Sequence, residues 1–199
     1  MACELLTKGR GLDCNRIAGG VKFVYFGVYD TFDTPINGTG IKVVSGEVTD
    51  IEMGVAGAAG KLYRYTMPLG AASVSETITG STENGTIFYT PTVNIVLNKI
   101  SKEDQNEIKL LGMSKVVIFA ELNQRVSSSS TNNVIIALGV TNGMSLNAGS
   151  IDTGAAFGDR NGYTLTFDGL EPLPFPVVAN YTATPFDNTD FDINSVVTS

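Results

Sequence analysis

Apolar side chains in this chain recur mostly at every second position, which is the spacing of β-strands. The clearest case is the stretch Lys22 to Tyr29, which is apolar on both faces. Such a strand is predicted to be buried on both sides, or covered on one side by a partner subunit. The looser alternation of Ile41 to Met53 predicts a half-exposed strand pair with a turn near Gly46, and Lys61 to Leu69 predicts a further strand.

A long hairpin is predicted in the middle of the chain. Its arms are Val74 to Thr79 and Thr86 to Ile100, joined around Asn84-Gly85, a dipeptide that accepts the positive φ of tight turns. Pro91 has no N–H to give to a ladder, so we expect it at an edge, a bulge or a bend. Three later apolar runs predict further strands, over Val116 to Leu122, Val134 to Val140 and Tyr163 to Gly169.

One helix is predicted between these strands. Ser101 is a good N-cap, two acidic residues follow it in the first turn, and Gly112 supplies a stop. Ile108 and Leu111 lie three positions apart and would dock the helix on a sheet. The sequence as a whole therefore predicts an all-β fold, a sandwich or barrel of about eight to ten strands with one flanking α-helix.

The pattern divides the 199 residues into three parts. Residues 1–20 are interpreted as an N-terminal arm and residues 21–171 as one β-sandwich domain. From residue 172 the periodicity is lost and prolines become frequent, so residues 172–199 are predicted to form an extended C-terminal arm. Such a segment needs a partner surface to become ordered.

Composition narrows the chemistry that this fold can carry. The chain has no histidine, which excludes a Ser-His-Asp triad and any His-based metal site. Its two cysteines, Cys3 and Cys14, cannot complete a four-ligand zinc site alone; we expect free thiols, with a disulfide as the alternative. No apolar stretch precedes the first charges and none is long enough to span a membrane, so we expect neither a secretory signal nor membrane association.

Charge is distributed unevenly along the chain. The formal net charge is −7, and six of those units lie in residues 126–199, where Arg160 is the one basic residue against seven acidic ones. An acidic chain is a poor candidate for binding nucleic acid through its phosphates. The acidic last third is interpreted either as a solubilising tail or as a surface that repels, or docks on, a charged partner.

A search for catalytic groups finds only weak candidates. Asp50 with Glu52 and Asp190 with Asp192 have the spacing that places two carboxylates on one strand face, as a glycosidase requires. Such pairs are common in acidic surface strands, and no phosphate-binding loop or calcium loop is present in the sequence. We therefore expect no catalytic, cofactor-binding or metal-ligating residues, and a structural or binding protein rather than an enzyme.

Three stretches in order carry a resemblance to a known family: Gly19 to Phe26, Thr82 to Thr86 before the long strand and helix, and Thr153 to Phe167. Together they resemble virion structural proteins of tailed bacteriophages, and the order of elements is similar to that of tail tube proteins. The resemblance implies a β-sandwich with a flanking helix that assembles into stacked rings of six, with a lumen for genomic DNA. It also implies assembly in the host cytoplasm, residence in the virion tail, and contacts with other tail or neck proteins.

The resemblance also implies roles for particular residues. The polar positions expected to face the lumen, where DNA passes without being bound, are Asn94, Asn98, Thr164, Thr166 and Asp168. The residues expected at contacts between subunits are Phe23, Tyr25, Val55, Pro172, Phe175 and Phe186. Two alternatives stay open: a phage neck, ring or capsid decoration protein, and a β-sandwich module that binds carbohydrate or a receptor.

Overall fold

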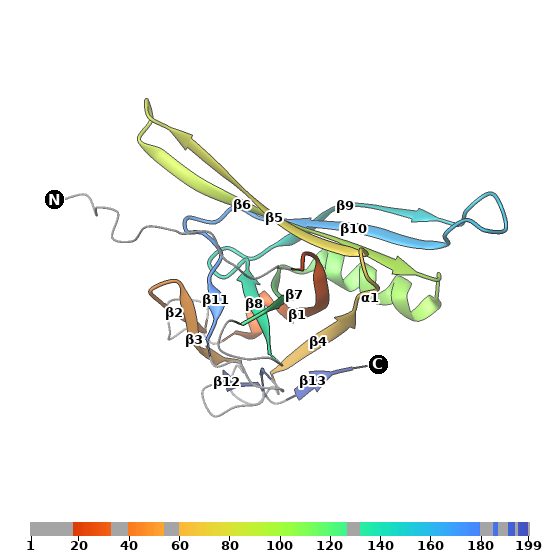
Figure 1. Cartoon of the computed structure of the whole chain (residues 1–199), viewed down its shortest axis with the longest axis horizontal. Coiled ribbons are helices and arrows are strands. Elements are labelled where there is room, and N and C mark those ends of the chain that lie inside the picture. The colour runs from red at the N-terminus through yellow and green to blue at the C-terminus, as the bar shows by residue number, and fades with distance from the viewer. Residues whose placement is uncertain are drawn as a thin grey trace.

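The computed structural model describes residues 18–32, 40–53, 60–126, 132–179, 185–186, 191–193 and 195–198. It is an all-β fold with one flanking helix, as the sequence predicts (Figure 1). Cys3, Cys14, Val55 and most of the predicted N-terminal arm lie outside the described residues. The elements in chain order are β1 (Val21–Val28), η1 (Tyr29–Thr31), β2 (Ile41–Val44), β3 (Glu47–Glu52), β4 (Lys61–Thr66), β5 (Ala72–Ser81), β6 (Thr86–Asn98), α1 (Lys102–Met113), β7 (Val116–Arg125), β8 (Asn133–Leu138), β9 (Ser145–Asp152), β10 (Gly162–Asp168), β11 (Val177–Val178), β12 (Phe191–Asp192) and β13 (Ser195–Val197).

The strands form two sheets. A nine-stranded sheet has the order β12-β3-β11-β8-β7-β1-β4-β13, with β2 paired to β3, and a four-stranded sheet has the order β5-β6-β10-β9. The four-stranded sheet is antiparallel throughout and packs across one face of the nine-stranded sheet. The fold is therefore a sandwich in which the central strands of the larger sheet have a core on each side.

The first core lies between the two sheets. Val24 and Phe26 of β1 meet Val93 and Phe167 of the four-stranded sheet, and all four side chains are almost completely buried. The rings of Phe26 and Phe167 have centroids 5.1 Å apart. Burial of this kind, at about 25 cal/mol per Å² of apolar surface, is the main force that holds the two sheets together.

Helix α1 closes one end of the first core. Ser101 caps it, because its Oγ accepts a hydrogen bond from the Asp104 N–H at 3.0 Å. Ile108 and Leu111 pack against the core, as their spacing predicts. The helix continues through Gly112 to Met113, so the predicted stop at Gly112 is one residue early.

The second core lies on the opposite face of β1. The larger sheet curls around it, since β1, β2, β3, β4, β7 and β8 all contribute buried side chains. Tyr25 of β1 meets Phe186 with ring centroids 4.8 Å apart, and Phe186 also contacts Phe119 at 5.2 Å. The strand apolar on both faces is therefore buried on both sides by its own chain, the first of the two predicted alternatives.

The prediction of an extended C-terminal arm is wrong for the described part of residues 172–199. β11 pairs with β3 and β8, β12 pairs with β3, and β13 pairs with β4. Phe186 and Phe191 are buried in the second core. The physical reason is that these aromatic side chains supply the apolar cover that the second face of the larger sheet needs, so the segment finds its partner surface on its own domain.

Other predicted elements are confirmed. The turn near Gly46 joins β2 to β3, and Ser45 and Gly46 both have positive φ, as tight hairpin turns require. The long hairpin is present as β5 and β6. Pro91 lies just past the end of the ladder between β10 and β6, because the last pair of that ladder is Asp168 with Thr92. The N–H that Pro91 lacks therefore costs no hydrogen bond in this ladder.

Candidate functional site

The five predicted lumen residues lie on one face of the four-stranded sheet. Asn94 and Asn98 of β6 share their face with Thr164, Thr166 and Asp168 of β10, because Thr166 is directly opposite Asn94 and alternate residues point the same way. The Thr166 hydroxyl donates to Asn94 Oδ1 at 2.7 Å. This face is the one turned away from the core, so the structure brings the predicted set together on an outer surface.

The same polar character extends across the sheet. Register places small hydroxyl and amide side chains on this face of all four strands, with few charges among them. Ser150 donates to Asp152 at 3.0 Å, and Asn147 donates to Asp168. The further residues of this polar face are Ser73, Ser75, Thr77, Thr90, Thr92, Ser150 and Asp152.

Both edges of the four-stranded sheet are open. Within the described residues neither β5 nor β9 pairs with a further strand on its outer side. The Lys99 N–H donates to the Asn161 carbonyl, and this bond fixes which residues on the β10 side direct their backbone groups toward β6. Because backbone groups of successive residues point in alternate directions in an antiparallel ladder, the N–H of Ile151 in β9 points outward, away from β10. Ile151 is 57 % exposed. A free edge of this length is a template for pairing with another chain.

The β5–β6 hairpin projects beyond the body of the molecule (Figure 1). We call the part beyond Pro91, residues 77–90, the arm. Its inner face continues the apolar inner face of the sheet, because Ile78 and Ile87 follow the same register as buried Ala72 and Val93. Ile78 is 63 % exposed and Ile87 is 58 % exposed. The apolar inner face of the arm therefore extends beyond the core and is exposed to solvent.

A pocket of about 250 Å³ lies at the base of the arm. Its wall joins the residues of β5 and β6 just before the arm (Glu76, Pro91), the end of β8 with the residues that follow it (Leu138, Val140) and the segment 171–176. Burial raises the pKa of the Glu76 carboxyl above its ordinary value of 4.5, although the bond from the Phe175 N–H acts the other way. Apart from two carboxyl groups the lining is largely apolar, as is typical of a site that takes an apolar group.

Glu171 fixes the wall of this pocket. It is 6 % exposed, and its two oxygens accept hydrogen bonds from the N–H groups of Thr141 and Asn142 at 3.0 and 2.9 Å. Its backbone forms a two-way bridge with Tyr89 of β6. The arm, the end of β8 and the segment after β10 are therefore held as one unit.

The predicted subunit contacts divide into two groups. Tyr25 and Phe186 are 3 % and 2 % exposed and lie in the second core, so they are not available to a second copy. Phe23 is half-buried and lies under the guanidinium of Arg64, 4.9 Å from its ring centroid. Phe175 and Pro172 are exposed, and Phe175 lines the pocket at the base of the arm.

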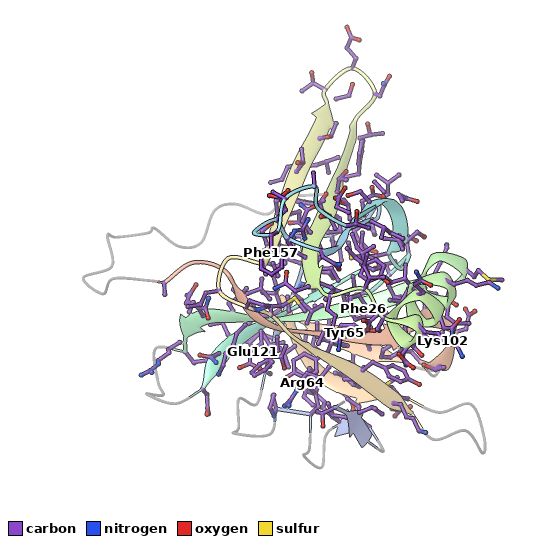
Figure 2. All side chains as sticks on the ribbon, turned by 90° about the vertical axis from the view of Figure 1, so that its right-hand side faces the viewer. Phe26, Arg64, Tyr65, Lys102, Glu121 and Phe157 are labelled. Atoms are coloured by element: carbon purple, nitrogen blue, oxygen red, sulfur yellow. The ribbon has the colours of Figure 1, made fainter. Side chains whose placement is uncertain are left out.

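The other buried carboxylate, Glu121, belongs to a structural network. It accepts hydrogen bonds from the Tyr25 hydroxyl at 2.9 Å and from Asn133 Nδ2 at 2.7 Å, and it lies 3.8 Å from Lys22 Nζ. Burial raises the pKa of the Tyr25 hydroxyl, and the Glu121 carboxylate raises it further. Tyr25 therefore remains a neutral donor, which is a structural role (Figure 2 labels Glu121).

In the part of the chain that the structure describes, no three His, Cys, Asp or Glu side chains gather closely enough to hold a metal ion. No helix among the described residues combines the length and apolar character needed to cross a membrane.

Comparisons with protein-family models, with curated proteins and with solved structures give no match. The features of the molecule that bear on its function are therefore the four-stranded sheet, its edges, its arm and its pocket. Sequence reasoning identified the polar face but missed the two open edges, because the order of strands in a sheet is not visible in local patterns. It also missed β9, most of whose residues are small or polar and exposed, with Leu146 and Ile151 as its two large apolar side chains.

Proposed function

We propose that this protein is a structural subunit of a bacteriophage tail tube, in which four-stranded sheets of neighbouring copies join edge to edge in a ring. The observation that carries the proposal is a sheet with two open edges and a polar outer face. Strand β9 runs antiparallel to β10, and β5 antiparallel to β6. In a rotationally symmetric ring, β9 of one copy therefore meets β5 of the next in the antiparallel sense, and the sheet continues unbroken.

The dimensions suit a channel for DNA. Six copies of a four-stranded sheet give a closed barrel whose circumference is about 115 Å, since strands lie about 4.8 Å apart. The corresponding distance between facing backbones is on the order of 37 Å, and strand tilt increases it. That width leaves room for a duplex after the side chains of the polar face are allowed for.

The chemistry of the polar face also supports the proposal. A channel that passes DNA must avoid holding phosphates, and phosphate binding depends on clustered lysine and arginine. Hydroxyl and amide side chains make up most of the face, Val96, Ala148 and Phe88 are its apolar members, and Asp152 and Asp168 are the charged residues on it. The guanidinium of Arg160, which lies near this face, donates to the Thr164 hydroxyl and the Tyr163 carbonyl. The protein as a whole carries a charge of −7.

The direct test is electron microscopy of the purified protein with light scattering for mass. We expect rings or short tubes with a central hole, and a mass of six chains of 21.0 kDa, about 126 kDa, or its multiples. A protein that stays monomeric at every concentration, and that binds a glycan saturably, would contradict the proposal and favour a receptor-binding module.

A pair of variants tests the edge directly. Ile151→Pro removes an outward N–H without touching the internal ladder, whereas Ile151→Val keeps it. We expect the proline variant to need at least a tenfold higher concentration to form rings, with unchanged monomer folding by circular dichroism. Ring formation that is equally strong in both variants would contradict closure through β9.

A further inference from the structure

The loop between β9 and β10, residues 153–161, presents an aromatic side chain to solvent. Phe157 at its tip is fully exposed, the most exposed large apolar side chain among the described residues (Figure 2). Single exposed apolar residues are common on protein surfaces. A fully exposed phenylalanine on an ordered loop is different, because aromatic anchors of this kind supply much of the energy of protein interfaces.

Hydrogen bonds hold this loop in one conformation. The Asp159 carboxylate accepts from the N–H groups of Ala155 and Ala156 at 2.9 and 2.6 Å, and these bonds lower the pKa of its carboxyl. Gly154 has a φ of +73°, which other residues rarely adopt, and Arg160 ties the end of the loop to β10. The loop thus presents Phe157 in advance of binding, which lowers the entropy lost when an interface forms.

The pocket at the base of the arm has the size and character to receive this ring. Its volume is about 250 Å³, and an apolar cavity of about 150 Å³ is enough to hold benzene. Leu138, Val140 and Phe175 contribute to its apolar lining. Leu173 stands at its mouth and is 66 % exposed.

The loop and the pocket lie at opposite ends of the four-stranded sheet. The loop follows the end at which Gly162 pairs with Asn98, whereas Pro91, in the pocket wall, lies beyond the other end of β10 (Figure 1). Seven residue steps of β6 separate these points, about 24 Å along the strand. A loop at one end and a pocket at the other cannot meet within one chain, so a contact between them requires two copies.

Charge favours the same pairing. Arg160 in the loop donates to neutral oxygens, and in the described part of the chain it has no carboxylate within ion-pair distance. The charged groups in the pocket wall are Glu76 and Glu171, both acidic. Docking of Phe157 would therefore bring the Arg160 cation toward two carboxylates, while the carboxylate of Asp159 in the same loop accepts hydrogen bonds from the N–H groups of Ala155 and Ala156.

We propose that Phe157 of one copy enters the arm-base pocket of a second copy, and that this contact joins successive rings head to tail. The proposal rests on the ring assembly argued above and adds how rings stack. One phenylalanine buries only about 150–250 Å², less than a stable interface needs alone. In a ring of six the contact is repeated six times, and such multivalency makes individually weak contacts strong. Phe157 and the pocket lie on different surfaces of the molecule. A contact between them is therefore heterologous, and it repeats along an axis instead of closing in a dimer.

Because the chain has no tryptophan, Phe157→Trp supplies a single fluorescent reporter at the contact. We expect its emission to shift to the blue, and its quenching by acrylamide to fall, as assembly proceeds with rising concentration. Combination with Leu173→Lys, which places a cation at the pocket mouth where Arg160 would arrive, should abolish both changes. Leu173→Met keeps the apolar mouth and should preserve them. Emission that stays unshifted in assembled tubes would overturn the proposal.

Electron microscopy separates stacking from ring closure. Phe157→Ala and Leu173→Lys should each give rings that need at least a tenfold higher concentration to stack. Leu110→Ala, a change at another exposed apolar residue on α1, should stack as the original protein does. When Phe157→Ala rings and Leu173→Lys rings are mixed, they should form pairs of rings, because the Leu173→Lys ring supplies Phe157 and the Phe157→Ala ring supplies the intact pocket.

The outcomes are distinguishable. Rings that stack equally well without Phe157 would overturn this inference and leave ring closure standing. A wild-type protein that forms no assemblies of any kind would overturn both. Mixed variants that pair no better than either variant alone would also contradict the head-to-tail contact.

Discussion

The two sheets of this protein differ in how much of each is covered by the rest of the chain. The nine-stranded sheet curls around a core of its own, and its second face is sealed by Phe186 and Phe191 from the C-terminal segment. The four-stranded sheet has one buried face, one polar face and two open edges. Both faces of the larger sheet are thus covered within one chain, whereas the smaller sheet, within the described residues, leaves its polar face uncovered and both edge strands unpaired on their outer sides.

This difference separates stability from assembly. Changes in the larger sheet should lower the free energy of unfolding of the monomer, because its contacts are internal. Changes on the edges, the arm or the 153–161 loop should leave the monomer folded and alter only how copies associate.

The largest effect is expected from Phe186→Ala. Its ring lies between Tyr25 and Phe119 in the second core, so truncation leaves a cavity and should lower the free energy of unfolding by about 3–5 kcal/mol. The matched control is Phe88→Ala on the arm, 38 % exposed, which should change it by no more than about 0.5 kcal/mol. Urea unfolding measures both. Equal losses would show that the two regions do not differ as described.

An intermediate effect is expected from Glu121→Ala. The change leaves the buried Tyr25 hydroxyl without its acceptor and should cost about 1–3 kcal/mol. Tyr25→Phe removes the other partner and should cost less. Because the two residues share one hydrogen bond, the double variant should lose less than the two single losses added together. Strict additivity would contradict the network.

A smaller effect is expected at the helix that closes the first core. Ser101→Ala removes the N-cap bond to the Asp104 N–H and should lower stability by about 1 kcal/mol. Ser114→Ala at the other end of α1 is the control, because its side chain makes no cap bond there. Thermal unfolding followed by circular dichroism compares the two. A control that loses as much as Ser101→Ala would contradict the capping role.

The smallest effect on the monomer is expected from pH acting on the 153–161 loop. The folded pKa of Asp159 lies below its ordinary value of 3.8, so the loop bonds are fully present above that value and are lost as the pH falls through the lowered pKa. Amide exchange of Ala155 and Ala156 should accelerate in that acidic range while the core amides stay protected. Asp159→Asn should show faster exchange already at neutral pH, with no change in the unfolding midpoint of the core.

Local patterns in the sequence predict much of this architecture. The two-faced apolar run of β1, the hairpin at Asn84-Gly85 and the cap at Ser101 depend on neighbours in the chain, and the structure confirms all three. Strand β9 was not predictable in this way, because small, exposed side chains leave no apolar alternation. Its strand conformation comes from pairing with β10.

The candidate site follows the same division. Alternation on β6 and β10 is enough to collect Asn94, Thr164 and Thr166 on one face. The open edges, the pocket and the position of Phe157 relative to it depend on which strands lie side by side, and that order is set by contacts between distant parts of the chain. The fate of the C-terminal segment was misjudged for the same reason, since its prolines are visible in the sequence and its docking surface is not.

The pairing of the C-terminal segment has a consequence for the order of events during synthesis. Ser195 pairs with Lys61 and Phe191 pairs with Ile51, so strands made early wait for partners made much later. Contacts so distant in sequence form slowly. Until residues 186–197 have left the ribosome, the second core is open, and its exposed aromatic side chains are at their most vulnerable to aggregation. A nascent chain halted before that point would expose the apolar interior of the larger sheet. We expect its dependence on chaperones to end only when β12 and β13 have emerged.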